Sequence, residues 1–297
     1  MENTSQKNVI LITGCSSGFG LLTAARLAAK GHKVIATMRD FNKRAALLEE
    51  VERRGGEIDL LFLDVTDKDS IKKTIEEVGD KYGYIDVLVN NAGYGLGGFF
   101  EDLDENEIRE QFETNFFGVQ NVTRMVIPMM RQRKRGKIIN ISSSAGLSGS
   151  PCFGAYNASK WALEGFSESL RYELKFFGID VLLIEPGTYR TKIFYENARY
   201  GRNFYNEGSP YHPISRFMES RVKDYVDDCH KDPEEIAILI ENLIKAKNPR
   251  FRNIPDIETQ TQAFLRKLLP FNIYSMLIHK TIFSRLKLPE DEAYQIK

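Results

Sequence analysis

Short runs of apolar, mostly β-branched residues alternate with longer amphipathic stretches over the first two thirds of the chain. Such runs are typical of buried strands, and the stretches between them place apolar residues at helical spacing. The predicted strands cover residues 9–13, 33–38, 58–65, 85–93, 137–142 and 179–187, with a short closing strand around 251–254. Apolar strands separated by helices predict a parallel sheet with helices on both faces. We therefore expect an α/β, doubly wound parallel sheet of about seven strands.

The alternation stops after Gly187. Residues 188–230 are rich in Tyr, Asn, Arg, Gly and Pro, which predicts an irregular insertion, with a helix near its end, that serves as a substrate lid. A helix over 233–247 follows, with Asp232 as its N-cap. Residues 256–297 are basic and apolar together and predict a helical C-terminal extension of one or two helices broken at Pro270. The whole chain, 1–297, is expected to form a single domain.

Composition excludes several classes of function. The 41 basic and 41 acidic residues cancel, so no net field favours nucleic acid. The three cysteines (Cys15, Cys152 and Cys229) form no CxxC pair and the four histidines no HExxH pattern, so we expect no metal site and no disulfide framework. The polar N-terminus lacks a signal pattern and no apolar run reaches the ~20 residues that span a bilayer. A cytoplasmic protein is expected.

Three glycines follow the first strand directly, in the sequence TGCSSGFG. Gly14, Gly18 and Gly20 would let the backbone turn sharply and approach a pyrophosphate. The pyrophosphate would lie at the N-terminus of the following helix, near Phe19. A plain tight turn is the alternative interpretation. In this position, between a strand and a helix, the pattern favours a Rossmann fold that binds a dinucleotide.

The end of the second strand, ATMRD, bears on which dinucleotide binds. Met38 stands where an NAD site usually offers a carboxylate, and Arg39 follows it, while Asp40 should point away. Ser16 and Ser17 could donate further hydrogen bonds to a 2′-phosphate. We therefore expect NADP(H) in preference to NAD(H), with Arg39 as a solvated surface charge as the alternative.

Other strand ends should complete the nucleotide site. Asp64, with Val65 beside it, could accept from the adenine amino group or cap the next helix. The small residues of NNAG, which are Asn91, Ala92 and Gly93, would let a cofactor lie against the backbone.

Groups with possible acid–base chemistry gather at the same edge. Ser143 ends the fifth strand, and Tyr156 and Lys160 share one helix face because they are four residues apart. Ser143 is chosen over its two serine neighbours by its spacing to Tyr156 alone. Asn115 lies in a long helix predicted over 104–133.

These motifs together resemble the short-chain dehydrogenase/reductase family. TGCSSGFG matches its TGxxxGxG element, NNAG its fourth-strand motif, and Ser143, Tyr156 and Lys160 its S–YxxxK set. The resemblance extends to a catalytic asparagine, Asn115, and to PGTYRT, which contains Pro186, Gly187 and Thr191. It covers residues 8 to 190 closely, and the glycine loop, ATMRD and extended C-terminus are most similar to the hydroxysteroid and retinol dehydrogenase-like branch.

The resemblance implies a role for each of these residues. Tyr156 would be the general acid or base, with its pKa lowered by the Lys160 ammonium and, in the oxidised complex, by the positive nicotinamide. Lys160 would also hold the nicotinamide ribose, and Ser143 the substrate oxygen. Asn115 would support a proton-relaying water, and Thr191 would bind the carboxamide. The family's usual assembly implies a homodimer or homotetramer that associates through the 104–133 helix and the YNASK helix.

The substrate is less constrained than the chemistry. Besides Ser143, the pocket candidates are mostly aromatic or apolar: Tyr94, Leu96, Gly149, Phe153, Tyr189 and Phe194. They favour a hydrophobic ketone, aldehyde or secondary alcohol, although the lid aromatics could simply pack on one another. The C-terminal extension either packs over the pocket or a subunit interface, or makes peripheral contact with a membrane. A non-catalytic dinucleotide-binding regulatory or scaffold protein is the alternative function, and an epimerase or dehydratase is the third.

Overall fold

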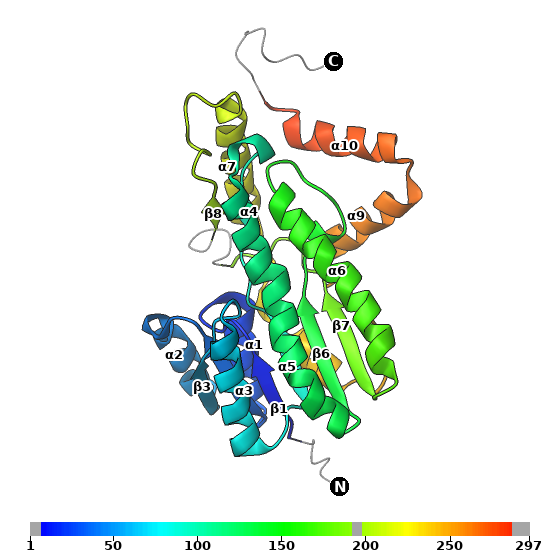
Figure 1. Ribbon diagram of the computed structural model, residues 1–297. Helices are drawn as coiled ribbons and strands as arrows, with labels where there is room; N and C mark the ends of the chain where they lie inside the picture. Colours follow the sequence, from blue (N-terminus) through cyan, green and yellow to red (C-terminus); the bar gives the residue numbers. More distant parts are fainter. Residues whose placement is uncertain (1–6, 192–197, 287–297) are drawn as a thin grey trace.

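A computed structural model describes residues 7–191 and 198–286, and its centre is a seven-stranded parallel sheet. The strand order is β3-β2-β1-β4-β6-β7-β9, so the chain winds outward from β1 in one direction and then in the other (Figure 1). The strands are β1 (Val9–Ile12), β2 (Lys33–Met38), β3 (Ile58–Phe62), β4 (Val87–Asn90), β6 (Gly136–Ile141), β7 (Ile179–Ile184) and β9 (Arg252–Asn253). This topology confirms the predicted doubly wound sheet.

Helices cover both faces of the sheet. One apolar cluster lies beneath α1, α2 and α8, and the other beneath α3, α5 and α6, which is the face toward the viewer in Figure 1. The helices are α1 (Gly18–Ala29), α2 (Ala45–Arg53), α3 (Lys68–Tyr82), α4 (Glu105–Phe112), α5 (Gly118–Gln132), α6 (Gly154–Lys175), α7 (His212–Asp227), α8 (Glu234–Lys245), α9 (Ile257–Leu268) and α10 (Phe271–Phe283). Because the central strands are buried on both sides, most of their side chains enter apolar layers on one face or the other.

Helix starts agree with the capping residues in the sequence to within one position. Asp67 caps α3 by accepting hydrogen bonds from the N–H groups of Asp69 and Ser70. Helix α8 begins at Glu234, one residue later than predicted, although Asp232 Oδ1 accepts from the Glu234 N–H at 2.9 Å. The caps therefore satisfy N–H groups that have no partner within the helix.

The long helix predicted over 104–133 is confirmed, because helical backbone runs from Glu105 to Gln132. A π-helical turn that was not predicted, η3 (Glu113–Phe117), lies inside it between α4 and α5. Within it Asn115 is buried, and its amide accepts from the Tyr94 N–H at 3.1 Å and donates to the Tyr94 carbonyl at 2.9 Å. A wide turn directs this side chain toward the loop after β4, and apolar periodicity does not encode such a turn.

The described part of the predicted insertion contains more order than expected. Strand β8 (Arg199–Tyr200) pairs in parallel with β5 (Leu96–Gly97), and α7 follows. The ring centroids of Tyr200 and Phe204 are 4.3 Å apart, so these aromatics do pack on one another. Its function as a lid stays a prediction.

In its described part, residues 256–286, the C-terminal extension contains two helices separated at Pro270, as predicted. Both are tied to the rest of the chain: Asp256 accepts from the Gly187 N–H at 2.9 Å, and the hydroxyls of Tyr274 and Ser148 lie 2.7 Å apart. The two helices also expose apolar side chains, including Phe264, Leu268, Phe271 and Met276. Over the described ranges, none of the helices combines the length and apolar character needed to cross a bilayer.

Candidate active site

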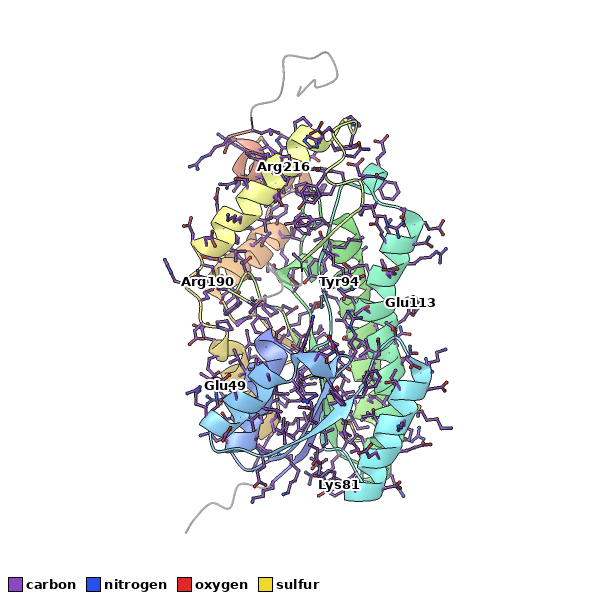
Figure 2. All side chains as sticks on the ribbon, turned by 90° about the vertical axis from the view of Figure 1, so that its left-hand side faces the viewer. Glu49, Lys81, Tyr94, Glu113, Arg190 and Arg216 are labelled. Atoms are coloured by element: carbon purple, nitrogen blue, oxygen red, sulfur yellow. The ribbon has the colours of Figure 1, made fainter. Side chains whose placement is uncertain are left out.

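The predicted site residues meet in one cavity of about 340 Å³ at the carboxyl ends of the strands. Figure 2 shows Tyr94, one of the lining residues, near the middle of the molecule, with Arg190 on one side and Glu113 on the other. Nineteen of the predicted residues line the cavity: Gly14, Ser16, Ser17, Gly18, Phe19, Arg39, Asp64, Val65, Asn91, Ala92, Gly93, Tyr94, Ser143, Tyr156, Lys160, Pro186, Gly187, Tyr189 and Thr191.

The glycine loop is shaped for a close backbone approach. Gly14 has φ +72° and Gly18 has φ +55°, which are left-handed conformations that favour glycine. Gly20 does not line the cavity. A Cβ on Gly20 would come within 2.4 Å of Asn91 Nδ2 and 2.5 Å of the Gly14 carbonyl oxygen, so Gly20 lets α1 pack beneath the loop. The N-terminal turn of α1 is thereby held against the cavity, where its N–H groups suit a pyrophosphate.

The nucleotide end of the cavity carries two cations. Arg39 and Lys43 both line it, and Lys43 was not identified from the sequence. The expectation that Asp40 points away is wrong, because it also lines the cavity, but its Oδ1 accepts from the Asn42 N–H at 3.0 Å and caps that turn. Local capping thus holds the Asp40 carboxylate against its own turn, and the two cations are the charges that would attract a bound phosphate.

Asp64 also bonds within its own turn. Its Oδ1 accepts from the N–H and hydroxyl groups of Thr66, at 2.9 and 2.8 Å. Because Asp67 caps α3, the alternative that Asp64 is the helix cap is wrong. Asp64 lines the cavity, as an adenine contact would require, but that contact stays a prediction.

Tyr156 and Lys160 are next to each other on α6. Lys160 Nζ lies 5.9 Å from the centroid of the Tyr156 ring and donates to the Ile141 carbonyl at 2.8 Å. Ser143, at the end of β6, also hydrogen-bonds the Tyr156 side chain. The three side chains predicted to carry the chemistry are therefore brought together.

Burial controls the protonation of this pair. It raises the pKa of Tyr156 above its ordinary value, and the Ser143 hydrogen bond offsets only part of that rise. In the chain by itself the pKa of Tyr156 is thus raised and not lowered, and its lowering by Lys160 together with the positive nicotinamide of the oxidised complex stays a prediction. Burial likewise lowers the pKa of Lys160 to about 8, against the influence of the Glu164 carboxylate, which raises it. Removing a charged group from water disfavours its charged form, whichever sign it carries.

Asn115 lies behind the cavity and does not line it. A Cβ on Gly93 would lie 3.1 Å from Asn115 Oδ1 and 3.9 Å from Lys160 Nζ, so the asparagine sits close to the ammonium group. Its hydrogen bonds hold the backbone of Tyr94 and reach the Ser159 hydroxyl at 3.3 Å. The structure shows Asn115 as a support for the loop after β4. Its predicted role with a relay water stays a prediction.

The substrate candidates separate into different environments. Tyr94 and Tyr189 line the cavity, but the Tyr189 hydroxyl bonds Glu235 at 3.2 Å and its ring packs on Phe19. Gly149 instead lines a second cavity against α10, and Phe153 and Leu96 belong to separate apolar clusters. Phe194 lies outside the described residues.

One residue at the mouth of the cavity was not identified from the sequence. The Arg199 guanidinium lies 4.4 Å from the centroid of the Tyr94 ring. Only the pairing of β5 with β8 brings it there.

No group of three or more metal-ligating side chains occurs among the described residues.

Several relatives of this chain are named as dehydrogenases or reductases. The short chain dehydrogenase family matches residues 8–200. Human retinol dehydrogenase 8 is 42% identical over 295 residues, covering 92% of this chain and 90% of that protein. The 3-ketodihydrosphingosine reductase of Bacteroides thetaiotaomicron is 39% identical over 247 residues, covering 83% and 87%. Rat estradiol 17-beta-dehydrogenase 1 is 34% identical over 290 residues, covering 95% and 83%.

Solved structures share the fold over most of the chain. A Burkholderia phymatum short chain dehydrogenase/reductase in complex with NAD has a TM-score of 0.78 at 25% identity, covering 96% of this chain and 98% of that chain. A metagenomic short-chain oxidoreductase in complex with NADP has a TM-score of 0.66 at 28% identity, covering 84% and 98%. These matches, together with the geometry of the cavity, show that the chain belongs to the short-chain dehydrogenase/reductase family, near its hydroxysteroid and retinol dehydrogenases.

Proposed function

We propose that this oxidoreductase uses NADP(H) to interconvert a hydrophobic ketone or aldehyde with its alcohol, and that Tyr156 transfers the proton. The observation that carries the proposal is the meeting of Ser143, Tyr156 and Lys160 at one end of a cavity whose other end holds two cations. The glycine loop fits a dinucleotide, because Gly14 and Gly18 adopt left-handed conformations beside the N-terminus of α1.

The chain's own residues account for the proton transfer. A nicotinamide supplies or accepts the hydride when it is bound. Because burial raises its pKa, Tyr156 keeps its proton at neutral pH and can give it to a carbonyl oxygen. Ser143 would hydrogen-bond that oxygen as negative charge develops on it. The Lys160 ammonium, 5.9 Å from the Tyr156 ring, would then stabilise the phenolate that remains.

Preference for NADP(H) follows from the charges at the nucleotide end. Arg39 and Lys43 face this part of the cavity, and Asp40 is engaged with its own turn. A 2′-phosphate would meet two cations there, which outnumber the single Asp40 carboxylate that could accept from a 2′-hydroxyl.

A hydrophobic substrate is supported by the walls and by the relatives. Tyr94 lines the cavity with an aromatic side chain. Retinol, estradiol and 3-ketodihydrosphingosine, for which three relatives are named, are apolar molecules with a hydroxyl or keto group. We also propose association into homodimers or homotetramers through α5 and α6, whose outer faces expose Phe117, Trp161 and Phe176.

The test is NADPH oxidation with a panel of apolar carbonyl compounds, including retinal and a steroid ketone, by the wild type and by Tyr156→Phe. We expect the variant to bind NADPH normally and to lose about 10²- to 10⁴-fold in kcat, the usual contribution of a general acid. If the wild type binds NADPH but reduces no carbonyl faster than Tyr156→Phe does, the protein is a dinucleotide binder without turnover.

A further inference from the structure

Two buried acids and one arginine lie directly behind the chemical end of the cavity. Glu164 is on α6, Glu185 follows β7, and Arg252 begins β9. The Arg252 guanidinium contacts Glu164 and lies 2.6 Å from Glu185 Oε1. The Glu185 side chain is fully buried and that of Glu164 is 7% exposed, so both carboxyl groups are removed from water. None of the three residues lines the cavity or was singled out from the sequence.

The charges in this cluster do not balance if both acids are ionised. Two buried carboxylates would share a single guanidinium. Two like charges at one buried site repel each other, which raises the free energy of ionising both groups. Glu164 Oε1, Glu185 Oε2 and the neighbouring Ser142 Oγ are all buried and make no hydrogen bond of good geometry, although Glu164 lies close enough to interact with both Ser142 and Glu185. A proton on one carboxyl would supply a donor for such oxygens. Consistent with this, burial raises the pKa of Glu164, and burial together with the Glu164 charge raises the pKa of Glu185 to about 7.

The cluster is connected to Ser143 by the backbone on both sides. Glu185 lies between Ile184 and Pro186, whose carbonyls accept from the N–H groups of Ser142 and Ser144, both at 2.8 Å. Ser142 and Ser144 are the neighbours of Ser143. A Cβ on Gly146, in the same loop, would lie 2.9 Å from Glu164 Cγ, so the loop rests on that side chain. Movement of either acid would therefore displace Ser143.

The cluster is connected to Lys160 through α6. Glu164 is one turn after Lys160 on the same face of the helix, and its carboxylate is the charge that raises the pKa of Lys160 against burial. Among the described residues, the charged and titratable groups that face Glu164 are Lys160 and Glu168 on α6, Glu185 after β7, and Arg252 on β9. The charge of Glu164, and with it the pKa of Lys160, thus depends on whether a proton lies on Glu164 or on Glu185.

We propose that Glu164 and Glu185 share one proton behind the Ser143 loop, and that this acid pair, held by Arg252, positions Ser143 and adjusts the charge on Lys160. The effect on turnover rests on the proposed function, whereas the shared proton does not. Both acids are positioning residues, since they act through Ser143 and Lys160 and do not line the cavity.

The shared proton is tested first, without any substrate. At pH 7 an infrared spectrum of the protein should contain a protonated carboxyl band that Glu164→Gln and Glu185→Gln both remove, because the remaining acid then pairs alone with Arg252. Glu168→Gln is the matched control: Glu168 is the next acid on the same face of α6 and lies 3.4 Å from Arg252, but it is exposed. Absence of the band from the wild type, or its loss in the control, would overturn the proposal whether or not any carbonyl is reduced.

The pH dependence of kcat/KM for carbonyl reduction then tests the link to Lys160. Two unit charges about 6 Å apart at an effective dielectric of about 20 change a pKa by about two units. The pKa of Lys160, about 8, lies above that of Glu185, about 7, so Glu164 carries most of a full charge on the alkaline limb. Glu164→Gln should therefore move the alkaline fall of activity about one to two pH units lower. Glu185→Gln leaves the full charge on Glu164 and should move the fall slightly to higher pH, while Glu168→Gln should not move it.

Both variants replace a glutamate by glutamine, so a general disturbance of the fold should shift the alkaline limb in the same direction in each. Shifts in opposite directions therefore indicate an effect of the charge on Glu164. Thermal unfolding and NADPH titration of each variant would verify that it is folded. If one variant does not fold, the shift in the other, measured against Glu168→Gln, still decides the matter. An unchanged alkaline limb in a folded variant, or shifts in the same direction, would refute the link to Lys160.

Discussion

Replacing Arg39 and Lys43 by alanine, singly and together, should remove the discrimination between NADPH and NADH. Both side chains are exposed at the nucleotide end of the cavity, where they would meet a 2′-phosphate, a group that NADH lacks. Asp40 cannot substitute for them, because it is an acid and its carboxylate already caps the turn through Asn42. The loss should therefore fall on NADPH.

The exposure of the two cations sets the size of the effect. Hydrogen bonds to charged groups contribute about 1.5–3 kcal/mol, and exposed pairs fall at the lower end because water and salt screen them. About 1.5 kcal/mol for each cation corresponds to roughly a tenfold weaker NADPH Kd in each single variant and about 100-fold in the double variant. The NADH Kd should change less than about twofold.

Fluorescence titration with both cofactors, at low and high salt, measures these constants. Lys68→Ala is a matched control, since Lys68 is an exposed lysine at the start of α3 that does not line the cavity. Added salt should weaken NADPH binding more in the wild type than in the double variant. Equal losses for NADPH and NADH, or a comparable loss in the control, would show that the two cations do not bind a 2′-phosphate.

Two further substitutions test the framework of the site. Gly20→Ala should weaken cofactor binding at least tenfold and destabilise the fold by about 1–3 kcal/mol, because its Cβ would lie 2.4 Å from the Asn91 amide nitrogen. Gly165→Ala, whose Cβ would meet nothing within 4 Å, should be neutral or stabilising in the same titration and thermal unfolding, and equal losses would contradict the packing argument. Asp256→Ala should lower the free energy of unfolding by about 1–2 kcal/mol and weaken cofactor binding, because it removes the α9 cap and the acceptor for the Gly187 N–H. Asp256→Asn keeps a hydrogen-bond acceptor and should recover part of the stability and part of the cofactor binding. A loss as large as that of Asp256→Ala would show that the hydrogen bonds of Asp256 are not the cause.

Local patterns were sufficient for much of the fold. Strand β2 has the bounds that its apolar run predicts, and the break at Pro270 separates α9 from α10. Both features are encoded within a few residues, through burial periodicity in one case and the missing N–H of proline in the other. The π turn around Asn115 and the pairing of β5 with β8 were missed because each depends on contacts with residues distant in the sequence.

The same limit applies to the candidate site. Strand ends and glycine spacing were enough to gather the residues that line the cavity, because parallel strands bring their carboxyl ends to one edge. Lys43 needed the turn capped by Asp40, and Arg199 needed strand β8, before either could be placed at the cavity. The two acids behind Ser143 and the arginine that they share come from three parts of the chain that only the folded sheet brings together.

The pKa of Tyr156 shows most clearly what spacing alone leaves out. A lysine four residues away predicts a lowered pKa, but the folded chain buries the phenol, and burial moves its pKa in the opposite direction. The neighbours along a helix follow from the sequence, whereas desolvation depends on every element packed around the group. With its proton retained at neutral pH, Tyr156 is suited to donate to a carbonyl oxygen. To accept a proton from an alcohol it needs positive charge beyond that of Lys160, whose own pKa burial has lowered to about 8.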